Sequence, residues 1–129
     1  MNEGRDRRRH FRLRYPGDAR PTVRVDGVER PLLEVSVRGL RIAAEAGEFD
    51  TGRSCTVELV LPNVYPIAID EGVVLRWDGG ECVLWLSDEI DHAVILCEQR
   101  RLIRRARKLR DVDALDLMRT RHRRVVGGD

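Results

Sequence analysis

The sequence has few of the residues on which small metalloproteins and disulfide-rich scaffolds depend. It contains three cysteines and three histidines in 129 residues, and aromatic residues make up only 5%. Cys55, Cys82 and Cys97 are widely spaced and include no CxxC pair, which is typical of a reducing compartment. All three occupy apolar positions, so we expect them to be buried, unreactive thiols. The histidines have no metal-ligand spacing, and no metal site is expected.

Long apolar runs and phosphate-binding glycine loops are also missing. No apolar stretch reaches about eighteen residues and the N-terminus lacks a hydrophobic signal segment, so we expect a cytoplasmic protein with no membrane partner. Neither GxGxxG nor GxxxxGK[ST] occurs, which excludes nucleoside triphosphate sites of those kinds. Ser36 is not part of a GxSxG elbow, which disfavours a nucleophilic role. We therefore predict no enzymatic activity and no cofactor.

Charge is abundant, and it is segregated along the chain. The net charge is only +2, but residues 1–24 hold eight arginines against three carboxylates, residues 25–98 hold five arginines against fifteen, and residues 99–129 hold eleven Lys and Arg against four. Both ends are therefore basic and the middle is acidic. All but one of the 24 basic residues are arginine, which suits forked contacts with phosphate and guanine.

The middle of the chain has the pattern of an antiparallel β-protein. Alternating apolar residues and turn signals predict a hairpin at Asp26-Gly27, a strand over 31–37, another over 39–44, one over 55–62, and two strands within 67–87 joined at Asp78-Gly79-Gly80. We assign Gly39 to a turn position that needs positive φ. Six short strands favour a closed antiparallel barrel, because closure hides the sheet edges.

The period changes after Asp88 to that of a helix. From 89 to 110 there is no Gly or Pro, and Ile95, Leu102 and Leu109 recur at helical spacing. Asp88 or Asp91 is expected to cap this helix. The segment from 111 either continues it or forms a second helix that turns back. The apolar stripe also permits a homo-oligomer that pairs through the helix.

Two short phrases carry a resemblance. "RRRHFR" from Arg7 to Arg12 fits RRxxxR with Arg7, Arg8 and Arg12 at the fixed positions, and "EVSVRG" from Glu34 to Gly39 is similar to [D/N]xSxxG. Each phrase alone is weakly specific. Their order before and within a predicted six-stranded barrel, followed by a helix, resembles the PilZ domain over roughly residues 5–105.

The resemblance implies a receptor for the bacterial second messenger cyclic di-GMP. In this reading Arg7, Arg8 and Arg12 donate to guanine edges and phosphates, Ser36 hydrogen-bonds the ligand, and Gly39 allows close backbone approach. Glu34 departs from the family's Asp or Asn and moves the acceptor outward by one methylene. The final strand also departs, because Trp85 occupies a region where many members have glycine and phenylalanine. We interpret Trp85, like Trp77, as a packing residue.

The predicted organisation has three parts. Residues 1–20 form a flexible arginine-rich arm, residues 21–90 a mainly β, six-stranded antiparallel PilZ-like barrel, and residues 91–125 a helix or helices. The predicted function is a cyclic di-GMP receptor that orders its arm over the ligand and signals to an unidentified protein partner. The alternatives are a degenerate module that binds a protein without nucleotide, and a basic nucleic-acid-binding protein. The acidic middle disfavours nucleic acid.

Overall fold

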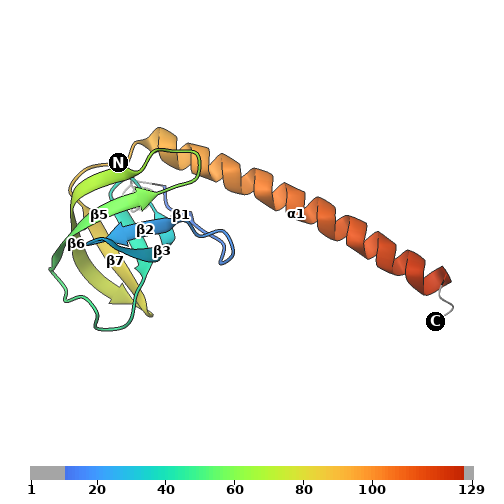
Figure 1. Cartoon of the computed structure of the whole chain (residues 1–129), viewed down its shortest axis with the longest axis horizontal. Coiled ribbons are helices and arrows are strands. Elements are labelled where there is room, and N and C mark those ends of the chain that lie inside the picture. The colour runs from blue at the N-terminus through green and yellow to red at the C-terminus, as the bar shows by residue number, and fades with distance from the viewer. Residues whose placement is uncertain (1–10, 127–129) are drawn as a thin grey trace, which may run out of the picture. The chain divides into compact units, whose positions relative to one another are not determined.

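The computed structural model places seven strands before a single helix (Figure 1). It describes the backbone of residues 11–126 and the side chains of residues 11–110. The chain divides into two compact units, Met1–Ile95 with all the strands and Leu96–Asp129 with most of the helix. The elements are β1 (Leu13–Arg14), β2 (Thr22–Val25), β3 (Val28–Val35), β4 (Gly39–Ala43), β5 (Ser54–Val60), β6 (Ile67–Asp78), β7 (Glu81–Leu86) and α1 (His92–Val126).

The strands form a closed barrel. Neighbouring strands follow the order β1-β3-β2-β5-β6-β7-β4, and an additional pairing of β3 with β4 closes the ring. All pairings are antiparallel. Six strands make the ring, and β1 lies outside it, paired only with β3. The predicted mainly β, six-stranded antiparallel barrel is therefore confirmed.

Both predicted hairpin turns are present. Asp26 and Gly27 have φ values of 51° and 83°, and Gly79 and Gly80 have values of 55° and 84°. Positive φ at both central residues matches the right-handed twist of the strands that a two-residue turn joins, and glycine adopts it without steric cost. The turns fix the registers in which Val25 faces Val28 and Asp78 faces Glu81.

The barrel interior is filled by the apolar half of each alternating strand. Buried side chains include Val23, Val25, Leu32, Leu33, Val35, Leu40, Ile42, Val57, Leu59, Ile69, Val74, Leu84 and Leu86. Cys55 and Cys82 are buried among them, as predicted, and burial raises the pKa of the Cys82 thiol to about 11. The prediction was wrong for Cys97, which is exposed, because a helix repeating every 3.6 residues turns this position away from Ile95.

The helix begins with a cap that the sequence indicated. The Asp91 carboxylate accepts a hydrogen bond from the Ala93 amide at 2.9 Å, which satisfies one of the orphan donors of the first turn. From His92 the helix runs without interruption to Val126. The alternative of a second helix that turns back after residue 111 is therefore wrong.

Candidate functional site

The motif residues that the structure describes lie on the outer face of the barrel, where β1, β3, β4 and β7 run side by side. In β4, Leu40 and Ile42 are buried, so Gly39 and Arg41 point outward. The registers align outward residues of four strands in one row: Arg14 opposite Glu34, Glu34 opposite Arg41, and Arg41 opposite Val83. We call the outward residues Arg14, Glu34, Arg41, Glu81 and Trp85, with the turn Ser36–Gly39, the motif face; Val83 lies in the same row but is buried.

The turn from Ser36 to Gly39 connects β3 to β4 at one end of this face. The Ser36 amide donates to the Gly39 carbonyl at 2.9 Å, and the Ser36 hydroxyl lies 3.3 Å from the same oxygen. Gly39 does not have positive φ, so the reason predicted for this glycine was wrong. A Cβ at Gly39 would lie 3.2 Å from the Leu84 carbonyl oxygen. Glycine is therefore favoured here because β7 packs closely against the turn.

Glu34 is held by an arginine of the neighbouring strand. Its carboxylate accepts from Arg41 Nε at 3.3 Å, and only 19% of the Glu34 side chain is exposed. Arg41 Nη1 also lies 3.0 Å from Asp78 and 3.7 Å from Glu81. One arginine thus serves three carboxylates, so the Glu34 oxygens are positioned by Arg41 rather than by solvent.

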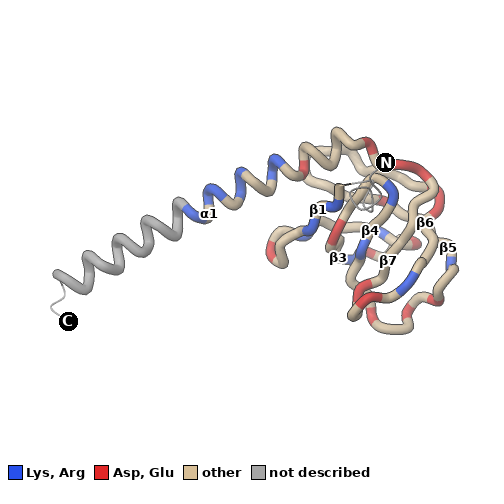
Figure 2. Tube along the Cα trace, turned by 180° about the vertical axis from the view of Figure 1, so that it is seen from behind, with Lys and Arg blue, Asp and Glu red and all other residues tan. Residues whose placement is uncertain are grey.

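A second arginine completes this network from the N-terminal side. Arg14 donates from Nη1 to Glu81 at 2.8 Å. This hydrogen bond lowers the pKa of Glu81 below its ordinary value and raises that of Arg14. The pKa of Asp78 is lowered chiefly by its hydrogen bond from Arg76. Figure 2 shows the basic and acidic residues on β1, β3, β4 and β7. The motif face is therefore a surface of paired charges.

Trp85 lies on the motif face, and the interpretation of this residue as a packing side chain was wrong. Its side chain is 39% exposed, because Leu84 and Leu86 on either side of it point into the barrel. Trp85 is paired in register with Gly39 of the motif turn. No polar alternation in the sequence marks this ring as outward, because Cys82 to Leu86 are all apolar.

Arg38 stacks on this tryptophan. Its guanidinium carbon lies 5.5 Å from the centre of the Trp85 ring, which is cation–π geometry. The same guanidinium donates to the carbonyls of Leu86 and Ser87 at 3.1 and 2.8 Å. Sequence reasoning assigned Arg38 no role, because these backbone acceptors lie 48 and 49 residues away. The pair presents two stacked planar groups next to the motif turn.

Trp77, by contrast, has the packing role that was expected. Its indole Nε1 donates to the Phe49 carbonyl at 3.0 Å, and its side chain is only partly exposed. Phe49 is buried, and two guanidinium groups lie near its ring, with Arg30 at 4.8 Å and Arg53 at 5.2 Å from its ring centre. These contacts belong to the loop after β4 rather than to the motif face.

Of the three arginines of RRxxxR, only Arg12 lies within the described residues. Arg7 and Arg8 lie outside the described residues. Arg12 is exposed and directly precedes β1. Leu13 pairs with Val35, so an antiparallel continuation by one residue brings the Arg12 backbone next to Ser36. Within the segment predicted as an arm, Leu13 and Tyr15 are buried, and the Tyr15 amide donates to the Leu33 carbonyl. The arm thus joins the barrel beside the motif turn.

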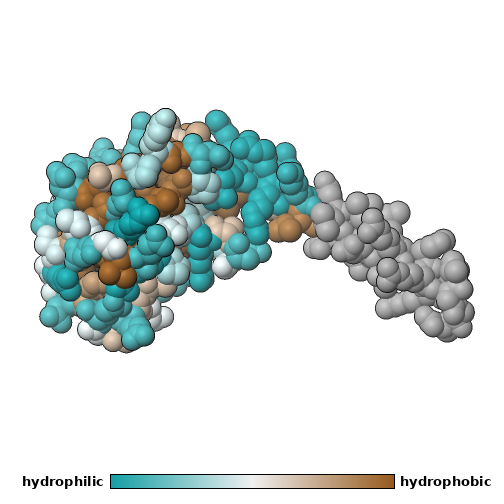
Figure 3. Space-filling model, viewed as in Figure 1, coloured by the Kyte–Doolittle hydropathy of each residue, from teal (hydrophilic) through white to brown (hydrophobic). Residues whose placement is uncertain are grey.

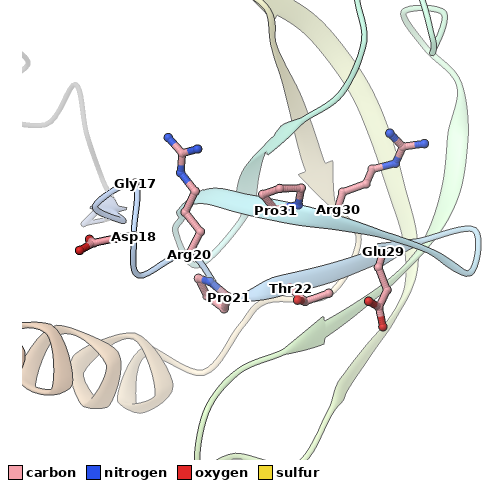
Figure 4. Close-up of a pocket in the computed structure, with 8 residues that line it drawn as sticks. All are labelled: Gly17, Asp18, Arg20, Pro21, Thr22, Glu29, Arg30 and Pro31. Atoms are coloured by element: carbon pink, nitrogen blue, oxygen red, sulfur yellow. The ribbon is translucent and has the colours of Figure 1, made fainter.

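A hollow elsewhere on the barrel contains none of the predicted site residues. It has a volume of about 440 Å³ and is lined by Gly17, Asp18, Arg20, Pro21, Thr22, Glu29, Arg30 and Pro31. In Figure 4 the side chains of Arg20 and Arg30 point to one side and that of Glu29 to the other. Arg30 is committed to Glu48 and to Phe49. The groups around the hollow therefore do not converge, and the motif face is the better candidate site.

Comparisons with known proteins agree on the fold. No family model and no curated protein sequence matches the chain. Among solved structures, the uncharacterised Legionella protein Lpg0364 is 20% identical with a TM-score of 0.53, and the match covers 76% of this chain and 98% of that one. The Bacillus subtilis inhibitor of motility, MotI/DgrA, is 22% identical with a TM-score of 0.57, over 74% of this chain and 51% of that one. The fold is PilZ-like.

A third structure is more distant. YcgR from Escherichia coli, solved in complex with c-di-GMP, is 18% identical with a TM-score of 0.47, and the match covers 81% of this chain and 48% of that one. The chain therefore spans about half the length of MotI/DgrA and of YcgR. The likeness to Lpg0364 and MotI/DgrA, at 20% and 22% identity, shows a shared fold and no more.

Proposed function

We propose that the chain is a cyclic di-GMP receptor that binds its ligand on the motif face. The observation that carries the proposal is the position of Arg12 next to the second motif. Arg12 precedes β1, which pairs with the end of β3 where Glu34 and Ser36 lie. Arg12, at the end of the first phrase, therefore lies beside the second phrase, which is more than twenty residues away in sequence. That position is what a ligand clamped between an arm and a barrel requires.

The chemistry of the ligand suits the groups gathered there. Cyclic di-GMP has two phosphodiester charges and two guanines, and each guanine edge offers O6 and N7 to a forked donor. Arg7, Arg8 and Arg12 supply such forks. The Ser36 hydroxyl provides a hydrogen-bonding group, and the Glu34 carboxylate accepts from guanine N1 and N2. The stacked pair of Arg38 and Trp85 adds a planar surface for a purine.

The receptor is proposed to act by binding and not by catalysis. Ligand contacts draw the arginine arm onto the motif face, and the ordered arm is the signal that an unidentified protein partner reads. The free energy that orders the arm comes from the difference in ligand affinity between the two arm states. An arm that gains no contact with the ligand would transmit nothing.

Isothermal titration calorimetry with cyclic di-GMP tests this proposal. The wild type should release or absorb heat with a saturable isotherm, and Arg8→Ala/Arg12→Ala should lose it. Arg24→Ala/Arg53→Ala is the matched control, because the carboxylate partners of these two arginines, Glu29, Glu58 and Asp26, lie outside the motif face, and it should bind as the wild type does. A silent wild type would refute the receptor.

One observation favours a second function on the same face. Glu34 is bound to Arg41, and Arg41 is shared with Asp78 and Glu81. A face whose charges are satisfied internally, with a half-exposed tryptophan beside them, also suits contact with a protein. A folded wild type that is silent with cyclic di-GMP would favour this degenerate PilZ-like interaction module.

A further inference from the structure

The helical unit contains a strongly basic segment that the barrel site does not use. Between residues 99 and 110 the helix has no Asp or Glu and seven cations, Arg100, Arg101, Arg104, Arg105, Arg107, Lys108 and Arg110. The preceding carboxylate, Glu98, is already bonded to Arg101 through both oxygens, at 2.8 and 3.0 Å. Figure 2 shows these residues as blue positions along the described part of α1. We call residues 99–110 the basic helix segment.

Apolar and basic residues are separated on this segment. Residues spaced i, i+4, i+7 share one face of a helix. Leu102, Ala106 and Leu109 form an apolar stripe, and two basic stripes contain Arg100, Arg104, Arg107 and Arg101, Arg105, Lys108. Ile103 lies in a mixed row with Arg107 and Arg110. Ile103 and Leu109 are 45% and 44% exposed. Figure 3 shows apolar surface on α1 within a hydrophilic surround. The segment therefore has both a basic face and exposed apolar groups.

The partner of such a segment must satisfy both kinds of group. A second copy pairing through the same segment would bring seven further cations against the first seven, which repel one another. A nucleic acid would satisfy the cations through its phosphates, but it would leave Ile103 and Leu109 in water. An anionic lipid surface satisfies both, because headgroup phosphates accept from the arginines while the apolar side chains enter the acyl boundary.

We propose that the basic helix segment adsorbs to the surface of anionic lipid bilayers, with α1 lying in the interface. Arg and Lys side chains extend past the apolar stripe to the headgroups, as long cationic side chains do at such interfaces. No helix among the described residues is long and apolar enough to cross a membrane. Adsorption requires no crossing, and it revises the sequence-based expectation that no membrane takes part. The proposal is independent of nucleotide binding.

Co-sedimentation of the intact chain with vesicles tests the proposal. The protein should pellet with phosphatidylcholine vesicles that contain phosphatidylglycerol, and not with pure phosphatidylcholine vesicles. Binding should weaken as salt is raised. Arg104→Gln/Arg107→Gln should weaken the partition coefficient by about 30-fold, because each removed cation contributes about fivefold near an anionic surface. Arg20→Gln/Arg24→Gln, which removes the same charge from the barrel, should bind like the wild type.

A second variant distinguishes binding to a lipid surface from binding to a polyanion. Ile103→Gln/Leu109→Gln keeps every charge and good helix formers, and it should reduce vesicle binding by at least several-fold while circular dichroism stays unchanged. Equal binding of this variant would overturn interfacial adsorption, as would equal binding of the wild type to pure phosphatidylcholine. A wild type that binds duplex DNA but not vesicles would overturn it in favour of a nucleic-acid partner.

Discussion

Shortening Glu34 by one methylene should tighten cyclic di-GMP binding. In the free protein the Glu34 carboxylate lies 3.3 Å from Arg41 Nε and is 19% exposed. Asp at this position draws the carboxylate back by roughly one C–C bond, about 1.5 Å, which takes it out of hydrogen-bond range of Arg41. The carboxylate is then free to accept from guanine N1 and N2 without first leaving an arginine.

The expected gain follows from two opposing terms. A hydrogen bond to a charged group contributes roughly 1.5–3 kcal/mol, whereas a partly exposed ion pair such as Glu34 with Arg41 is worth about 0–1 kcal/mol. Either carboxylate can make the guanine bond, and only that of Glu34 must first leave Arg41, so the worth of the ion pair sets the gain. Glu34→Asp should therefore bind cyclic di-GMP up to about 5-fold more tightly by calorimetry. The free energy of unfolding should fall by about 1 kcal/mol or less.

A control exists at the opposite end of β3. Glu29 also pairs with an arginine at 3.3 Å, through Arg24 Nη2. Glu29→Asp shortens an equivalent pair away from the motif face and should leave nucleotide affinity unchanged. If Glu34→Asp binds with unchanged or lower affinity, the acceptor already fits the guanine as it stands, and the reasoning about its release from Arg41 is wrong.

Further predictions concern the rest of the motif face. Trp85→Ala should weaken the binding of cyclic di-GMP by about 5- to 100-fold, because stacking of one base on an aromatic ring contributes roughly 1–3 kcal/mol. Quenching of tryptophan fluorescence by the ligand that is retained in Trp77→Phe and lost in Trp85→Phe would locate the stack at Trp85. Gly39→Ala should lower the free energy of unfolding in urea by about 1 kcal/mol, because its Cβ meets the Leu84 carbonyl at 3.2 Å, whereas Gly17→Ala meets nothing within 4 Å and should not. Acid should destabilise the barrel, because the pKa values of Glu81 and Asp78 are lowered in the folded state. Their contribution is present above the ordinary carboxyl pKa values and is lost as pH falls through the lowered ones. The melting temperature of Arg14→Gln should therefore fall less between neutral and acid pH than that of the wild type, and equal falls would contradict this assignment.

The barrel could be predicted from the sequence because the local turn and strand signals are consistent with closure of the sheet. Asp26-Gly27 and Gly79-Gly80 are strong turn signals, and they fix registers that place alternating residues inside. The two residues of β1 could not be predicted, because an arginine-rich stretch before a proline has no strand pattern of its own. Its pairing depends on the end of β3, some twenty residues later.

The site was predictable only in its motif residues. Glu34, Ser36 and Gly39 were found from a short phrase, but the hold of Arg41 on Glu34 depends on a β-bulge in the pairing of β3 with β4. The stacking of Arg38 on Trp85 joins residues 47 positions apart and leaves no trace in local sequence. Apolar residues also mislead, since Trp85 is hydrophobic and yet faces outward.

The most direct test of the central claim is a map of amide chemical shifts during titration of the ¹⁵N-labelled chain with cyclic di-GMP. We predict that the largest changes fall on Arg12 to Arg14, on Glu34 to Arg41, and on Val83 to Trp85. Changes confined to the hollow around Arg20 and Pro31, or no saturable change at all, would contradict a nucleotide site on the motif face.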